Sequence, residues 1–416
     1  MNIHVIGAGL AGLAAALTLS AAGRSVILHE SGPAAGGRCR SYFDRGLGCR
    51  IDNGNHMLLS GNHAAMAFLD EVGARHSLGG PGEAFFPFMD LANHESWSVS
   101  PSAGRLPWWL LRGKTRVPGT RSRDYLSVLK LSRAGAADTV LGVLGRTGEL
   151  YRRLLEPLAI SALNTRPDKA LARLLTPIID ESLMRGGSFC IPSFPRDGLS
   201  ESFIDPAIET LKARGATIRL ASRVSGLRQE GDRLAAIGFT DGEIALAAGH
   251  GVVMAVPSWV AADLLPGLTT PNAFEAILNI HYKIDAVAPA SWSRAGFCGL
   301  IGGTAEWVFA KPGVVSVTVS AANHLVDLPA EEIAARVWTD VQGVYGLKGA
   351  MPPVRVVKEK RATFAATAEQ EIRRPASRTH LKNLALAGDW TATGLPATIE
   401  GAIRSGRKAA ETLLTA

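Results

Sequence analysis

The sequence predicts an α/β fold in which a parallel sheet shares the chain with a second region of mixed α+β structure. A short apolar strand, a helix of small residues and a second strand open the chain, over residues 3–6, 10–22 and 25–29. Another apolar strand and a long helix close it, over 384–387 and 398–414. Because 416 residues exceed what one core usually supports, we expect long insertions between these pieces.

The middle of the chain alternates between helical and extended patterns. Helices are predicted over 62–72, 203–214 and 330–345, with 124–163 largely helical. Strands are predicted over 217–221, 251–256, 305–310 and 314–320, and a hairpin over 233–239 with 243–247. We therefore expect a nucleotide-binding domain from 1–60, 195–260 and 365–416, and an interleaved substrate-binding domain from 61–194 and 261–364.

Composition excludes several classes of protein. Hydrophobic residues make up 47% and charged residues 19%, which is ordinary for a folded globular chain. The net charge of +7 favours an anionic ligand or membrane surface over nucleic acid. Four scattered cysteines lack metal-ligand spacing, so we expect no metal and a reduced, cytoplasmic protein. No apolar run reaches the roughly 18 residues of a membrane-spanning helix, and the glycines of the apolar N-terminus argue against a cleaved signal peptide.

A glycine motif lies between the first strand and the first helix. Gly7, Gly9 and Gly12, with Leu10 and Ala11 between them, match G-x-G-x-x-G. The first glycine permits a tight turn, the second lets a pyrophosphate approach the backbone, and the third allows the helix to pack closely on the strand. About 20 residues later, Glu30 is placed to bind the adenosine ribose, and Ser31 follows it. The motif predicts a bound dinucleotide, either FAD or NAD.

Two further motifs resemble those of the amine oxidase and carotenoid desaturase superfamily of flavoenzymes. Gly36, Gly37 and Arg38 begin a G-G-R-x-x-S run, and a guanidinium suits bidentate phosphate binding. Gly388 and Asp389 end the last strand before the C-terminal helix. The resemblance implies FAD in a Rossmann-like domain of the GR2 type, similar to that of p-hydroxybenzoate hydroxylase. It also implies an adenine contact from the backbone of Val224.

Within that superfamily, the run from Gly388 to Ala402 is similar to the C-terminal signature of the hydroxysqualene dehydroxylases. The similarity extends through residues 52–56, 163–165, 279–282, 307–309 and 360–364, and so covers nearly the whole chain. It implies reductive removal of a hydroxyl from hydroxysqualene, giving squalene for hopanoid biosynthesis. It implies further FAD contacts from Gly54, Asn55, His56, Leu395, Pro396, Ala397 and Thr398. Asn55 departs from the family pattern, in which we expect glutamine.

His56 is the candidate catalytic residue. An allylic hydroxyl leaves poorly until it is protonated, and imidazole titrates near neutral pH. His56 could supply that proton or orient the substrate; alternatively, it only hydrogen-bonds its own loop. His281 and Tyr282 are weaker candidates that more often fill a core, and Asp52 is expected to fix the loop.

An aromatic and basic segment at 105–123 suggests a peripheral membrane contact. Trp108 and Trp109 lie within Leu106–Leu111, which is flanked by five arginines and one lysine, a composition that suits the headgroup region of a bilayer. These are Arg105, Arg112, Lys114, Arg116, Arg121 and Arg123. The alternative is a buried helix start with solvated arginines. For the whole chain, the alternatives to a dehydroxylase are a carotenoid or phytoene desaturase and a non-catalytic prenyl-lipid binding protein. The electron donor and the oligomeric state stay open.

Overall fold

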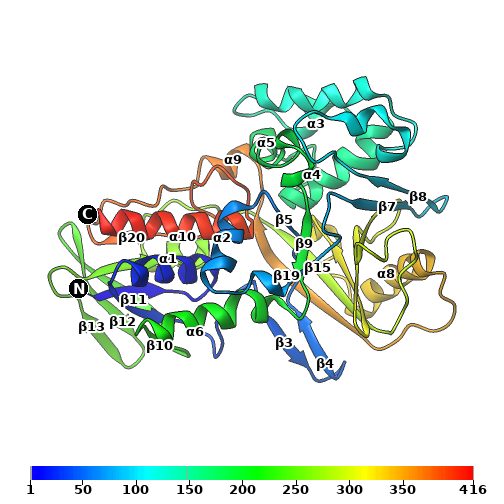
Figure 1. The fold of residues 1–416 in the computed structure, drawn as a ribbon. Helices are drawn as coiled ribbons and strands as arrows, with labels where there is room; N and C mark the ends of the chain where they lie inside the picture. Colours follow the sequence, from blue (N-terminus) through cyan, green and yellow to red (C-terminus); the bar gives the residue numbers. More distant parts are fainter. Residues whose placement is uncertain (1, 147, 416) are drawn as a thin grey trace.

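The computed structural model describes residues 2–146 and 148–415 and confirms the α/β class (Figure 1). A five-stranded sheet lies near both termini, and all its neighbouring strands are parallel. Its order is β10 (Thr217–Arg219), β2 (Ser25–His29), β1 (Asn2–Ile6), β14 (Gly251–Met254) and β20 (Leu384–Leu386). Strands from the start, middle and end of the chain therefore meet in one sheet.

Alternating side chains bury both faces of this sheet. Ile3 and Val5 of β1 pack on the side of the helices, whereas His4 and Ile6 point to the opposite side. The first face is covered by α1 (Leu10–Ala21), α2 (His63–Glu71), α6 (Asp205–Ala213) and α10 (Ile399–Leu414). The second is covered by an antiparallel sheet of β11 (Val224–Glu230), β12 (Arg233–Phe239) and β13 (Gly242–Ala245). The predicted hairpin is confirmed, with β11 as an additional strand.

Two glycines allow close packing here, Gly12 between α1 and the turn that precedes it, and Gly406 between α10 and α1. A Cβ atom at Gly12 would lie 1.9 Å from the carbonyl oxygen of Gly7, and one at Gly406 would lie 2.1 Å from that of Ala11. Any larger residue at either position would push a helix away from its neighbour. The contact between α1 and α10 thus fixes the end of the chain against its beginning.

A seven-stranded sheet forms the other half of the molecule. Its order is β19 (Val354–Phe364), β15 (Phe274–Lys283), β18 (Val314–Val319), β17 (Trp307–Lys311), β16 (Phe297–Ile301), β7 (Phe86–Asp90) and β8 (Glu95–Val99). One face packs on α8 (Ala330–Tyr345) through alternate apolar residues of the strands. Tyr282 points to that side and donates to the carbonyl oxygen of Ala334 (2.7 Å), so its expected role in the core is confirmed.

The segment 124–163 is less continuous than its sequence suggests. It contains part of η4 (Ser122–Arg133), a 3₁₀ helix, then α3 (Val140–Leu144), the π-helical η5 (Tyr151–Leu155) and α4 (Glu156–Leu163). Gly145 ends α3 with a φ of 76°, a conformation that side chains other than glycine rarely adopt. Together with α5 (Ala172–Glu181), these pieces form a lobe above the seven-stranded sheet (Figure 1).

Shorter elements complete the chain. The predicted strand over 217–221 ends at Arg219 because Ala221 has a φ of 51°, and the one over 251–256 ends at Met254. The remaining strands and α-helices are β3 (Ser41–Asp44), β4 (Cys49–Asp52), β5 (Leu58–Leu59), β6 (Leu78–Gly79), β9 (Pro192–Pro195), α7 (Ser258–Leu264) and α9 (Ala368–Glu371).

A histidine pair is buried beneath the five-stranded sheet. Nδ1 of His4 lies 3.1 Å from Nε2 of His29. Burial, reinforced by nearby cationic groups that include Arg219, lowers the pKa of both rings from 6.5 to about 4. Both imidazoles are therefore neutral in the folded protein at neutral pH.

This pair should make the protein sensitive to acid. The unfolded chain takes up these protons near pH 6.5 and the folded chain only near pH 4, so the free energy of unfolding should fall as the pH decreases across that range. Between pH 7 and pH 5, the free energy of unfolding should fall by about 3 to 4 kcal/mol more in the parent than in a His4→Asn/His29→Asn variant. Urea denaturation at the two pH values measures this difference, and equal losses in both proteins would contradict it.

Candidate functional site

The glycine motif forms the tight turn between β1 and α1. Gly7 has a φ of 104°, and a Cβ there would lie 2.6 Å from the carbonyl oxygen of Ala255, so the turn itself requires glycine. Gly9 differs, because its φ of −76° suits any residue and a Cβ there would meet no protein atom within 4 Å. Neither backbone strain nor protein packing accounts for glycine at position 9, which leaves room for a ligand close to the backbone.

The N-terminus of α1 carries free hydrogen-bond donors beside that space. Among the described residues, no side chain caps the helix, and its first turn holds no acidic residue. The first N–H groups of a helix lack acceptors within the helix and carry a partial positive charge. A pyrophosphate is a ligand that such a helix end binds well.

Glu30 directly follows β2 and binds the backbone of the glycine turn. Its carboxylate accepts hydrogen bonds from the backbone N–H of Ala8 (2.9 Å) and of Gly32 (2.7 Å), and Ser31 donates to it over 3.2 Å. The N–H of Ser222 donates to the carbonyl oxygen of Glu30 (2.8 Å), which brings the start of β11 at Val224 to the same end of the sheet. The residues predicted to hold ribose and adenine are thus neighbours.

Arg38 connects the N-terminal glycine motif to the C-terminal Gly388–Asp389 motif. Gly36 donates its N–H to the carbonyl oxygen of Ala8 (2.8 Å) and forms a parallel bridge with Gly9. From the following loop, the guanidinium of Arg38 lies 2.7 Å from a carboxylate oxygen of Asp389. That ion pair places Gly388 and Asp389 directly beside the first glycine motif.

Two charged residues support this arrangement: Arg374 was missed in the sequence, and Glu400 was included in the C-terminal motif without a role. Arg374 is buried and binds the backbone carbonyl groups of Asp389 and Thr391, as well as the hydroxyl of Thr393 (2.9 Å). Glu400 is buried at the start of α10 and accepts from the N–H groups of Ala64 (2.9 Å) and Ala65 (2.8 Å) at the start of α2. Their partners are distant in sequence, and a local pattern carries no signal for such contacts.

The C-terminal motif ends in a well-defined helix start. Thr398 caps α10 by accepting from the N–H of Gly401 (3.0 Å), and Leu395 and Pro396 are buried before it, with Ala397 half-buried. This cap leaves the other first-turn N–H groups of α10 available to a ligand.

A network of polar side chains fixes the loop that contains Gly54 and Asn55. The Asn55 amide donates to the hydroxyl groups of Ser316 (2.8 Å) and Thr318 (3.0 Å) on β18. Ser316 also lies 2.8 Å from Nδ1 of His281 on β15. A Cβ at Gly54 would come within 3.1 Å of the amide nitrogen of Asn279, so the loop lies tightly against the sheet.

Asp52 anchors the same loop, as expected. Its carboxylate accepts from the hydroxyl of Ser41 (2.6 Å) and the N–H of Leu199 (2.9 Å), and it pairs with the ammonium group of Lys311 on β17. Although burial opposes it, the charge of Lys311 lowers the pKa of Asp52 below its ordinary value. This carboxyl is therefore ionised and fully engaged, which suits a structural role.

His56 is not held by its own loop. Within the described part of the chain its imidazole makes no protein hydrogen bond, which contradicts the alternative that it serves only to tie the loop. The ring is half-buried, and burial lowers its pKa to about 4 while Asp52 opposes that shift and Arg38 and Lys311 add to it. At neutral pH His56 is thus a neutral imidazole with free ring nitrogens, not a store of protons.

The face of the seven-stranded sheet opposite α8 has two chemical halves. Asn279 and His281 of β15, opposite Thr318 and Ser316 of β18, form the polar half. The aromatic half is built from β16, β17 and the neighbouring β9, with ring centroids about 6 Å apart. Its members are Phe194, Phe297, Trp307 and Phe309. Met57 packs on these rings directly after His56, so His56 lies at the boundary between the halves.

The chain matches the family model of the flavin-containing amine oxidoreductases over residues 10–414. It is similar over its whole length to an oxidoreductase of known structure from Methanosarcina mazei, with a TM-score of 0.73 and 18% identity over 99% of this chain and 100% of that one. The chain therefore belongs to this class of flavoenzymes. It is an oxidoreductase, and FAD is its cofactor.

Relatives with higher sequence identity identify the family within this class of flavoenzymes. The hydroxysqualene dehydroxylase of Zymomonas mobilis is 45% identical over 99% of this chain and 99% of its own length. That of Sinorhizobium fredii is 44% identical over 100% of this chain and 98% of its own length. A probable zeta-carotene desaturase of Synechococcus elongatus, covering 100% of this chain and 99% of its own, is only 23% identical. The protein belongs to the hydroxysqualene dehydroxylase family, as the sequence motifs predicted.

Substitution of Gly9 and Gly12 should separate binding from folding. The Cβ of a valine at position 9 would meet no atom of the described residues within 4 Å, so the Gly9→Val variant should fold with an unchanged melting temperature but purify without bound flavin. A valine at position 12 must displace the Gly7 carbonyl, so Gly12→Val should lose both the flavin and stable folding. Flavin absorbance and thermal unfolding report the two properties; full flavin content in Gly9→Val would contradict the assignment.

Proposed function

We propose that this protein removes the hydroxyl group of hydroxysqualene reductively and releases squalene and water. The observation that carries the proposal is the sheet face on which a polar half meets an aromatic half at His56. A long hydrocarbon with a single hydroxyl presents the same division of chemistry. The family relationship to named hydroxysqualene dehydroxylases supports the same substrate.

The division of the chain into domains follows from this proposal. We assign FAD to the five-stranded sheet and its covering elements, from 1–60, 195–260 and 365–416. We assign substrate binding to the second domain, which consists of residues 61–194 and 261–364. The proposed FAD contacts are Gly7, Gly9, Leu10, Ala11, Gly12, Glu30, Ser31, Gly36, Gly37, Arg38, Gly54, Asn55, His56, Val224, Gly388, Asp389, Leu395, Pro396, Ala397 and Thr398.

When bound in reduced form, FAD supplies the hydride that replaces the hydroxyl. The protein must then help the carbon–oxygen bond to break. Positive charge develops on the carbon as the hydroxyl leaves, and the face of the half-buried Trp307, which packs against the buried Phe297, would stabilise such charge. Trp307 is held for this role, because its indole N–H donates to the hydroxyl of Ser161 on α4 (2.5 Å).

His56 orients the departing hydroxyl in this scheme. A neutral imidazole can donate one hydrogen bond and accept another, so it can hold the hydroxyl and pass a proton to it from water. Its low pKa means that the imidazolium form contributes only in acid. The aromatic half excludes bulk water from the remainder of the substrate.

Product analysis tests the reaction. Anaerobic holoenzyme reduced with dithionite should convert hydroxysqualene to squalene, and the oxidised holoenzyme with phytoene should give no desaturated product. Chromatography of the extracted lipids measures both. Desaturation of phytoene, or intact hydroxysqualene after full reduction of the flavin, would favour the desaturase alternative.

Replacement of His56 tests its role. His56→Ala should slow flavin oxidation by hydroxysqualene roughly 100-fold or more, the range seen for a positioned proton-transfer group, whereas His56→Gln should recover part of that rate through its amide. Stopped-flow absorbance gives the rates, and Phe43→Leu, at an exposed position of β3, serves as a control. An unchanged rate in His56→Ala would exclude the residue from the reaction.

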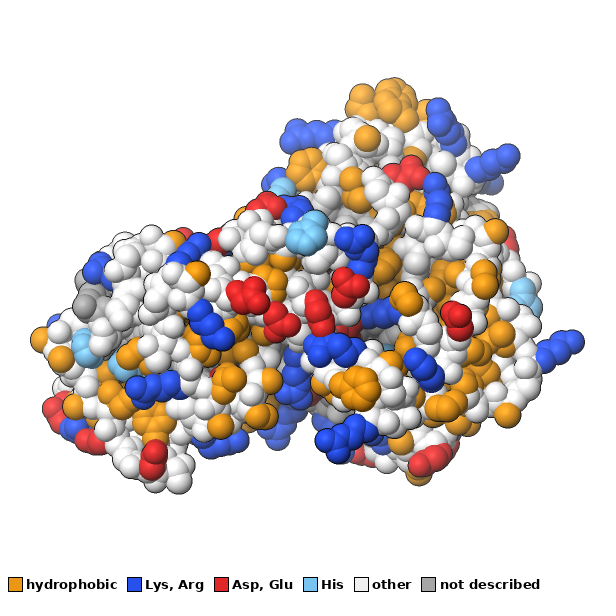
Figure 2. Space-filling model, turned by 60° about the horizontal axis from the view of Figure 1, so that its bottom comes forward, with side chains coloured by type: hydrophobic (Ala, Val, Ile, Leu, Met, Phe, Trp, Pro, Cys, Tyr) orange, Lys and Arg blue, Asp and Glu red, His pale blue; other side chains and the backbone are white. Residues whose placement is uncertain are grey.

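A peripheral membrane contact is the second part of the proposal. Five large apolar side chains of the helical lobe are exposed by 48–69%: Leu106, Trp108, Leu111, Leu126 and Leu129. We call this set the Leu106–Leu129 surface. Exposed arginines and lysines surround it, and Figure 2 shows apolar side chains with Lys and Arg beside them at the tip of the lobe. Such a surface suits an anionic bilayer, from which a hydrocarbon substrate could enter without crossing water.

The structure corrects one member of the predicted patch. Trp109 is only 6% exposed and packs edge-on against Tyr125, with ring centroids 5.2 Å apart. It therefore belongs to the core of the lobe, and only Trp108 of the pair is available to lipid. No helix among residues 2–146 and 148–415 is long and apolar enough to cross a bilayer.

Liposome flotation tests the surface. A Trp108→Ala/Leu111→Ala/Leu126→Ala variant should bind phosphatidylglycerol liposomes roughly tenfold more weakly or worse, because it removes apolar area that the bilayer would bury. The matched control is Val287→Ala/Ile372→Ala, which truncates two side chains that are 91% and 84% exposed elsewhere on the protein. Equal flotation of both variants and the parent would contradict a membrane contact at this surface.

A further inference from the structure

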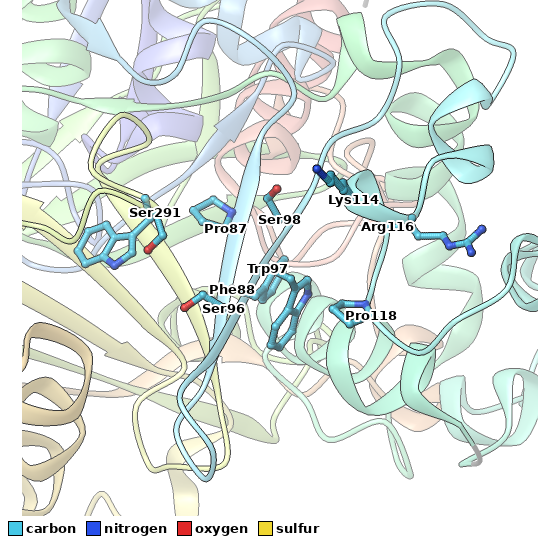
Figure 3. A pocket seen from close by; sticks show the side chains of 11 residues that line it. Pro87, Phe88, Ser96, Trp97, Ser98, Lys114, Arg116, Pro118 and Ser291 are labelled. Carbon is cyan, nitrogen blue, oxygen red and sulfur yellow. The ribbon is translucent and has the colours of Figure 1, made fainter.

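A pocket of about 390 Å³ lies beside the Leu106–Leu129 surface, on the outer edge of the seven-stranded sheet (Figure 3). Its walls come from β7 and β8, from the loop of residues 113–118, and from the turn at Ser291 and Trp292. The loop continues directly from Leu111, one of the exposed apolar residues. Its position is fixed by the N–H of Ser100, which donates to the carbonyl oxygen of Thr115 (3.0 Å).

The polar groups of this pocket are chiefly hydrogen-bond donors and cations. Lys114 lines it and forms no ion pair within the described part of the chain, and no carboxylate is among the lining residues. The hydroxyl groups of Ser96, Ser98 and Ser291 add three more polar groups. Arg116 also lines the pocket, but its guanidinium binds the carbonyl oxygen of Leu110 (2.6 Å) and points away in Figure 3. Among the lining residues that the structure describes, Lys114 is thus the free cation of the site.

Two tryptophans of the pocket have unsatisfied indole groups. Trp97 is 9% exposed and Trp292 is 1% exposed, and the Nε1 atoms of both are buried without a hydrogen-bond acceptor among the described residues. Buried N–H groups are nearly always paired, so two orphan donors at one pocket are unusual. Both nitrogen atoms are enclosed by the protein, so a ligand in the pocket meets Lys114 and the hydroxyl groups rather than these N–H groups.

We propose that this pocket binds the phosphate-bearing headgroup of an anionic phospholipid. The free cation and the hydroxyl groups match the charge and acceptors of a phosphodiester. The adjoining apolar surface places the pocket at headgroup depth when its leucines enter the acyl region. The inference rests on the proposed membrane contact and deepens it, because it selects one class of lipid.

Vesicle binding with matched variants tests the headgroup site. The parent should bind phosphatidylglycerol vesicles more tightly than phosphatidylcholine vesicles. Lys114→Gln and Ser96→Ala/Ser98→Ala should each weaken binding to phosphatidylglycerol roughly fivefold. Lys130→Gln and Ser132→Ala, exposed on η4 outside the pocket, should have smaller effects. Equal effects of pocket and control variants would overturn the proposal, because only general surface charge would then remain.

Soluble glycerol 1-phosphate distinguishes the two sources of the phosphate. If it binds the parent as tightly as the vesicles do, and Lys114→Gln abolishes that binding, the pocket serves a soluble ligand and the lipid assignment is wrong. Weak binding of glycerol 1-phosphate supports the lipid. Turnover of hydroxysqualene in detergent should be the same in all pocket variants as in the parent protein. If the parent protein itself shows no turnover, that result contradicts the proposed reaction and leaves the headgroup site unaffected.

Discussion

The close contact between α1 and α10 is the constraint on which the site depends. Gly406 lets α10 lie against the backbone of Ala11, and that position sets where β20 ends and where Asp389 meets Arg38. The two motifs come from opposite ends of the chain, yet parallel strands β1, β14 and β20 bring their carboxyl ends to one edge. Ligands of open α/β sheets bind at that edge, because helix N-termini and loops converge there.

Two buried charged residues hold the motifs in this arrangement. Arg374 holds the backbone that follows β20, and Glu400 ties the start of α10 to the start of α2. Both are buried, and each has several partners, which is the condition under which a buried charge is tolerated. Their loss would displace the motifs without touching a ligand directly.

In the proposed reaction, the second sheet supplies the chemical specificity. Its face toward the site carries amides, hydroxyls and a histidine on β15 and β18, and aromatic rings on β16 and β17. His56 stands between them with free ring nitrogens, while Asp52 and Lys311 neutralise each other nearby. A substrate with one polar group and a long hydrocarbon matches that division, whereas a uniformly apolar polyene would leave the polar half without a partner.

The sequence was sufficient where local backbone geometry decides the structure. Gly7, Gly9 and Gly12 have separate roles that their spacing alone suggests, and the terminal strands and helices follow from short periodic patterns. It was insufficient where distant partners decide. Trp109 is as apolar and aromatic as Trp108, and only its packing against Tyr125 separates a core residue from a surface one.

The strand register of the seven-stranded sheet could not be predicted from the sequence either. Asn279 lies opposite Thr318, and His281 opposite Ser316, through long-range pairing that no short motif encodes. The polar and aromatic halves of the site exist only once that register is known. The motifs therefore predicted the cofactor and the family, but not the surface that faces the substrate.

A single-turnover measurement tests the central claim most directly. Reduced holoenzyme is mixed anaerobically with limiting hydroxysqualene, and oxidised flavin and squalene are quantified together. The account predicts that one flavin is oxidised for each squalene formed. Squalene formed without flavin oxidation, or flavin oxidation without squalene, would contradict it.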